Sequence, residues 1–154
     1  MRPALALVAA TAALLLAGCA SASGNRSGYG EETPVSEITG EWQLTKGSDA
    51  EGAMVVNGAP VTLVITDEAV SGQGPCNVYG GDLSVDGDVL SIDSIHQTLM
   101  ACEDDSRNTL ETRYMAALEN VSQSKLGGTD PETLTLSGPD ASLRFTIIEK
   151  RAAN

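Results

Sequence analysis

Three cysteines and a single histidine are the residues best suited to covalent chemistry in this chain of 154 residues. A cysteine beside a histidine can form an activated nucleophile. Two cysteines outside the cytoplasm instead pair by default in a disulfide. The choice between these chemistries for Cys76, Cys102 and His96 depends on where the chain resides, and the residues around Cys19 bear on that question.

The first 18 residues have the pattern of a secretion signal. Arg2 is followed by an apolar run over residues 4–16 that contains no charge. The run is shorter than the about 20 residues that a transmembrane helix needs. The run ends in Leu-Ala-Gly-Cys, which resembles the lipobox of bacterial lipoproteins. The resemblance implies cleavage before Cys19 and a lipid on its thiol, so we expect a lipid-anchored protein in the cell envelope, on the extracytoplasmic side of a membrane. An ordinary cleaved signal that happens to contain a cysteine is the alternative.

Residues 19–36 are rich in Ser and Gly and predict a flexible tether, which leaves residues 37–154 as one domain. Nine basic against 21 acidic residues give a formal net charge of −12. This balance argues against nucleic acid as a partner, because phosphate binding requires basic patches. The acidic runs at residues 86–88 and 103–105 do not have EF-hand spacing, so we predict no metal and no cofactor.

With Cys19 assigned to the lipid, Cys76 and Cys102 remain as an even pair in an oxidising location. We therefore expect a disulfide between them. A free catalytic thiol paired with His96 is the alternative. His96 follows Ile95 in an expected strand, which favours a half-exposed structural position for it.

Alternating apolar and polar residues predict several strands. Residues 61–66 form a β-branched run, and residues 83–92 form a hairpin around an Asp-Gly turn. A second hairpin covers residues 134–147. Trp42 and Leu44 show the same alternation, and we interpret Trp42 as a core residue.

One segment, residues 105–122, has helical rather than strand spacing. Its apolar stripe predicts an amphipathic helix that covers a sheet, with acidic residues 103–105 at its start. Glu111, Arg113 and Glu119 are expected to face solvent. The predicted fold is mainly β with one helix (α+β), a curved antiparallel sheet or pseudo-barrel packed by a single amphipathic helix. The stripe consists of Leu110, Tyr114, Ala117, Leu118 and Val121.

A series of motifs in order resembles the META domain, also called the HslJ-like family. The run over residues 70–81 contains the Cys-Asn-x-Tyr signature, and residues 98–102 resemble a Thr-x-Met-Ala-Cys strand of the family. The opening Gly-Glu-Trp-Gln-Leu and the late Leu-Thr-Leu hairpin also match. The resemblance covers nearly all of residues 40–148.

The resemblance implies a small β-rich pseudo-barrel in a bacterial envelope protein. In some bacteria the family is linked to heat-shock induction and antibiotic tolerance. Because the family has no established catalytic mechanism, it supplies no catalytic residues. The two cysteines match positions that pair in relatives that have both. Asn77 and Tyr79 are expected to build the signature loop, with the Tyr79 hydroxyl outward. A contact role for these two residues in binding is the alternative.

We therefore expect a monomeric, non-enzymatic envelope module that binds an unknown envelope protein or supports tolerance to envelope stress. A small-ligand binder that uses the barrel interior is one alternative. A hydrolase that uses Cys and His is the other.

Overall fold

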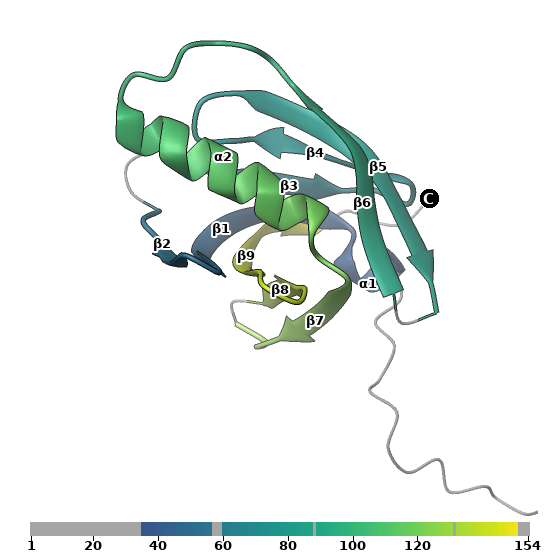
Figure 1. Ribbon diagram of the computed structural model, residues 1–154. Helices are drawn as coiled ribbons and strands as arrows, with labels where there is room; N and C mark the ends of the chain where they lie inside the picture. Colours follow the sequence, from purple (N-terminus) through teal and green to yellow (C-terminus); the bar gives the residue numbers. More distant parts are fainter. Residues whose placement is uncertain (1–34, 57–59, 88, 131, 151–154) are drawn as a thin grey trace, which may run out of the picture. The chain divides into compact units, whose positions relative to one another are not determined.

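One antiparallel sheet is the main element of the part of the chain that the structure describes (Figure 1). The computed structural model describes residues 35–56, 60–87, 89–130 and 132–150. The predicted signal peptide, Cys19 and nearly all of the tether lie outside these residues. Within the described residues no helix is both long enough and apolar enough to cross a membrane. In chain order the elements are α1 (Val35–Ile38), β1 (Gly40–Asp49), β2 (Gly52–Met54), β3 (Thr62–Ile65), β4 (Ala69–Gln73), β5 (Val78–Asp86), β6 (Val89–Gln97), α2 (Asp105–Glu119), β7 (Gln123–Gly127), β8 (Thr133–Ser137) and β9 (Ser142–Lys150).

Among the described residues the sheet has nine strands, in the order β6-β5-β4-β3-β1-β9-β8-β7, with β2 paired to the end of β1. The register shifts twice between β1 and β9 and once between β5 and β6. Such bulges bend the bulged strand and increase the local twist. The sheet therefore curls into a half-barrel, and the predicted curved sheet with one main helix is confirmed.

The two edges of the curled sheet are linked by the segment that follows α2. The Ser122 amide donates to the Ser137 carbonyl of β8 at 2.8 Å, and the Ser122 carbonyl accepts from the Leu90 amide of β6 at 3.0 Å. Ser122 thus continues the pairing of the edge strand β7 with β8 and also bonds to β6, the strand at the other edge. In Figure 1, α2 lies across the concave side of the sheet.

The core lies between α2 and the inner face of the sheet. Trp42 is fully buried, and its indole nitrogen donates to the Ile38 carbonyl at the end of α1 at 2.8 Å. The burial confirms Trp42 as a core residue. The bond holds the short α1, which the sequence did not predict, against the sheet. Other fully buried residues include Val61, Leu63, Tyr114, Leu118, Leu134, Leu136, Leu143 and Phe145.

The start of α2 is fixed by its acidic residues, as predicted. Asp104 is the N-cap, and its side chain accepts from the Arg107 amide at 2.9 Å. The Ser106 hydroxyl and this amide lower the pKa of Asp104, because both donate to the ionised carboxylate. The helix ends at Glu119, earlier than the predicted residue 122.

The sequence missed three strands, β2, β4 and β7, and it assigned residues 98–102 wrongly to a strand. The pairing of β6 with β5 does not continue into residues 98–102, because the Asn77 side chain takes the place of the β5 backbone as hydrogen-bond partner. Thr98 still donates to the Val78 carbonyl at 3.0 Å, but the next backbone groups, those of Met100, bond to the Asn77 side chain.

Replacing Leu118 by Ala tests the contact between α2 and the sheet. Leu118 is fully buried, so we expect its truncation to lower the free energy of unfolding by about 2–5 kcal/mol. Glu119→Ala, on the exposed side of the same helix, should change it by no more than about 0.5 kcal/mol. Urea denaturation followed by tryptophan fluorescence measures both. Equal stability of the two variants would contradict a sealing role for α2.

Candidate functional site

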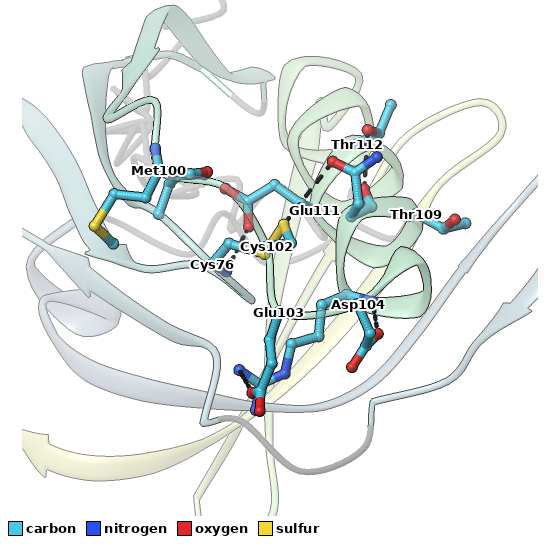
Figure 2. The surroundings of a disulfide bond; sticks show 12 residues. Cys76, Met100, Cys102, Glu103, Asp104, Thr109, Glu111 and Thr112 are labelled. Carbon is cyan, nitrogen blue, oxygen red and sulfur yellow. Dashed lines mark hydrogen bonds and ion pairs between the residues drawn. A yellow bond between two sulfur atoms is a disulfide. The ribbon is translucent and has the colours of Figure 1, made fainter.

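The turn between β4 and β5 places the signature residues against α2. The Gly74 amide donates to the Asn77 carbonyl at 2.7 Å, which closes a turn with Pro75 and Cys76 at its tip. Cys76 is joined by a disulfide to Cys102, with 5.3 Å between the two Cα atoms (Figure 2). Because both sulfurs are in this bond, neither is a free thiol. His96 lies exposed on β6, with its Nδ1 atom 3.2 Å from the Ser94 carbonyl oxygen.

Glu111 of α2 lies beneath this turn, and the prediction that it faces solvent is wrong. Its side chain is 3% exposed, and its Oε2 atom accepts from the Cys76 amide at 2.9 Å. Oε1 has no hydrogen-bond partner among the described residues. A Cβ atom at Gly74 would stand 2.9 Å from Oε2 and 3.0 Å from the Asn77 carbonyl, so the close approach of helix and turn requires glycine there.

Tyr79 points inward, which corrects the expectation of an outward hydroxyl. It is 2% exposed, and its hydroxyl donates to the Thr62 carbonyl of β3 at 2.8 Å. Because the Tyr79 proton is already donated to Thr62, the Tyr114 hydroxyl is the donor in the 2.8 Å hydrogen bond between the two tyrosines, and Tyr79 is the acceptor. Burial chiefly, and the nearby Glu111 carboxylate, raise the pKa of Tyr79, so both phenols remain protonated at neutral pH.

Asn77 holds residues 98–102, a segment that we call the strap. Its Oδ1 atom accepts from the Thr98 hydroxyl at 2.9 Å and from the Met100 amide at 2.7 Å, and its Nδ2 atom donates to the Met100 carbonyl at 3.4 Å. Asn77 is 5% exposed, so these bonds are shielded from water. With the disulfide at Cys102, the strap is fixed at its start, middle and end.

The strap nevertheless carries large apolar side chains into solvent. Leu99 is 94% exposed and Met100 is 59% exposed, and Val78, which bonds to Thr98, is 51% exposed. In Figure 2 the Met100 side chain extends away from the disulfide and from α2. An open cleft of about 320 Å³ adjoins the strap, with Ala101, Cys102, Gly74 and Pro75 among its lining residues.

Arg113 also departs from the expected solvent-facing position. Its guanidinium binds both carboxylate oxygens of Asp49, at 2.8 and 2.5 Å, and donates to the Gly52 carbonyl at 2.8 Å. The Arg113 hydrogen bond lowers the pKa of Asp49 below its ordinary 3.8. The pair therefore stabilises the fold above that pH, and the contribution is lost as the pH falls through the lowered pKa. Through Arg113, α2 is thus bonded to the end of β1 and the start of β2.

These polar groups bond to other parts of the domain, whereas Leu99 and Met100 of the strap remain exposed beside an open cleft. Within the described residues no group of three or more His, Cys, Asp or Glu side chains is placed to hold a metal ion. The sequence did contain a signal for the inward Glu111, because it lies three residues before Tyr114 and seven before Leu118, on the same helix face. The exposure of Leu99 carries no comparable signal.

Replacing Glu111 by Ala tests the contact of helix and turn. The Cys76 amide would lose its acceptor, and we expect the free energy of unfolding to fall by about 1–3 kcal/mol. Chemical denaturation of this variant beside Glu119→Ala measures the difference. A loss no larger than that of the exposed control would show that the buried carboxylate is dispensable.

The disulfide makes a separate prediction. A chain in which Cys19 is replaced by Ser should show no free thiol under native conditions until it is reduced. The loop spans 26 residues, so reduction should lower the free energy of unfolding by about 3–4 kcal/mol in the chain-entropy model. Thiol labelling with mass spectrometry, followed by denaturation of both forms, checks this. Full labelling without reductant would rule the bridge out.

Comparison with known proteins places this architecture. The META domain family model matches residues 36–150. An NMR structure of a protein from Burkholderia xenovorans is 25% identical, has a TM-score of 0.62, and is matched over 75% of this chain and 88% of its own. A second NMR structure is 19% identical with a TM-score of 0.51, over 75% of this chain and 94% of its own, which shows the fold alone. No curated protein matches. Since the family model spans most of the sequence, the chain belongs to the META domain family.

Proposed function

We propose that this protein is a lipid-anchored envelope protein whose META domain acts without catalysis, by binding another protein through the strap. The Leu-Ala-Gly-Cys sequence at residues 16–19 and the preceding apolar run support the anchor. A tether over residues 19–36 would leave the domain free to meet a partner near the membrane.

The observation that carries the binding role is the exposed apolar strap held in one conformation. Leu99 and Met100 lie on a segment that Asn77 and the disulfide fix on both sides. Because the strap is already ordered, a partner that covers Leu99 gains apolar burial without the entropic cost of ordering the loop. Rigid apolar side chains at the centre of a contact are typical binding hot spots.

The alternative of a small ligand inside the barrel has less support. The space between α2 and the sheet is occupied by large side chains, among them the fully buried Trp42, Tyr114 and Phe145. Two open clefts have described linings: one lies between the β4–β5 turn and residues 101–107, and the other lies along α2. Both clefts open to the surface, and neither is a cavity inside the barrel.

The anchor is tested by changing Cys19 to Ala. We expect the variant to incorporate no palmitate and to remain in the unprocessed form, because the lipid-modified thiol is the substrate for maturation. Metabolic palmitate labelling in cells, with the unchanged chain and a Cys76→Ala/Cys102→Ala chain as controls, measures this. Undiminished label in Cys19→Ala would refute the lipid anchor.

The binding surface is tested by a photo-crosslinking residue at position 99 of the full, lipid-anchored chain in intact cells. We expect a discrete protein adduct there and none at position 89. Val89 is a matched control, because it is 57% exposed and lies at the opposite end of β6. Met100→Ser should weaken the adduct at position 99. Absence of an adduct at 99, or equal adducts at both positions, would contradict binding through the strap.

A further inference from the structure

We propose, on the basis of the proposed function, that the strap's partner is a protein segment that combines apolar side chains with lysine or arginine. The apolar part of this requirement comes from Leu99 and Met100, which are 94% and 59% exposed. The cationic part comes from the residues that follow the strap. Glu103, Asp104 and Asp105 are all exposed.

The acidic residues carry a net negative charge at the edge of the strap. Residues 103–107 contain three carboxylates against the one guanidinium of Arg107, a local formal charge of −2, and of these charged residues Glu103 and Arg107 line the adjoining cleft. Asp104 is engaged in capping α2, whereas the Glu103 side chain is 79% exposed. The acidic cluster alone would be a solvated surface. It becomes a candidate part of a binding surface because it adjoins the exposed apolar side chains of the strap.

Glu103 is available to a partner at little cost. Its Oε2 atom lies 3.4 Å from the Arg107 guanidinium, across one helical turn at an exposed position. Exposed pairs of this kind contribute about 0–1 kcal/mol, so a cation from a partner can replace or join Arg107. Glu103 and Arg107 both line the cleft of about 320 Å³, next to Ala101 and Cys102 of the strap. A basic side chain that enters the cleft would therefore meet the Glu103 carboxylate while its apolar neighbours cover Leu99.

Charge also separates this partner from two other occupants of an apolar surface. The chain has a formal net charge of −12, so an anionic bilayer would be repelled from the strap. A second copy would bring residues 103–105 of both chains together, and like charges at an interface are costly. For a basic segment with apolar side chains, apolar burial and charge attraction both favour binding to the strap.

Three synthetic peptides of matched length test the chemistry: one of Leu and Lys, one of Leu and Glu, and one of Ser and Lys. The processed lipoprotein in phosphatidylcholine nanodiscs is titrated with each, and fluorescence anisotropy gives the dissociation constants. We expect the Leu/Lys peptide to bind at least about tenfold more tightly than either of the others. Its affinity should fall as salt rises, because exposed charges are screened.

Variants locate the binding. Leu99→Ser, and separately the pair Glu103→Gln with Asp105→Asn, should each weaken binding of the Leu/Lys peptide by about fivefold. Glu119→Gln removes an exposed carboxylate of the same helix away from the strap and should leave the affinity unchanged. Equal binding of the Leu/Glu peptide, or no effect of the Glu103/Asp105 pair, would overturn the proposal.

An anionic bilayer and a second copy of the chain are tested in separate measurements. Leu99-dependent binding to phosphatidylglycerol vesicles, or a dimer in sedimentation that Leu99→Ser dissociates, would also overturn it. If position 99 crosslinks a protein in cells but the crosslinked segment contains no Lys or Arg, the binding function stands and the partner chemistry fails. If position 99 crosslinks nothing, the proposed function itself fails.

Discussion

Covering the concave face of the curled sheet is the constraint on which the rest of the structure depends. An antiparallel sheet that curls only halfway exposes an apolar inner face, and α2 is the element that buries it. Tyr114 and Leu118 are both fully buried against the sheet. The one-residue bridge at Ser122 then connects the two edges of the sheet directly after the helix. The segment that forms the core with the sheet therefore also joins the two edges of the sheet.

Three polar contacts fix where α2 lies on that face. Glu111 accepts from the β4–β5 turn, Tyr114 bonds to Tyr79 of β5, and Arg113 binds Asp49 at the end of β1. Apolar burial alone is non-directional and would allow the helix to slide. Hydrogen bonds with defined geometry select one position, and those beneath the turn are shielded from water, which strengthens them. The residues of the family signature thus connect the helix to the sheet.

The same signature also presents the strap. Asn77 uses its buried amide to hold Met100 by the backbone, so that the side chains of Met100 and Leu99 remain in solvent. A segment kept in place only by its own burial would have turned these side chains inward. The disulfide from Cys76 to Cys102 fixes the far end of the strap covalently. An ordered apolar surface beside an acidic helix start is the feature that we connect with partner binding.

The sequence by itself determined the fold class, the hairpins and the start and apolar face of α2, because these depend on local periodicity and capping. The pairing of Cys76 with Cys102 followed from the cysteine count and the expected location. Only the tertiary structure decided the inward position of Glu111, whose burial depends on an acceptor being needed by an amide 35 residues away. It also decided that residues 98–102 are not a strand. The family resemblance suggests one, but the side chain of Asn77, from another segment, binds the amide and carbonyl of Met100 that a neighbouring strand would have used. Long-range partners of this kind leave no local pattern in the chain.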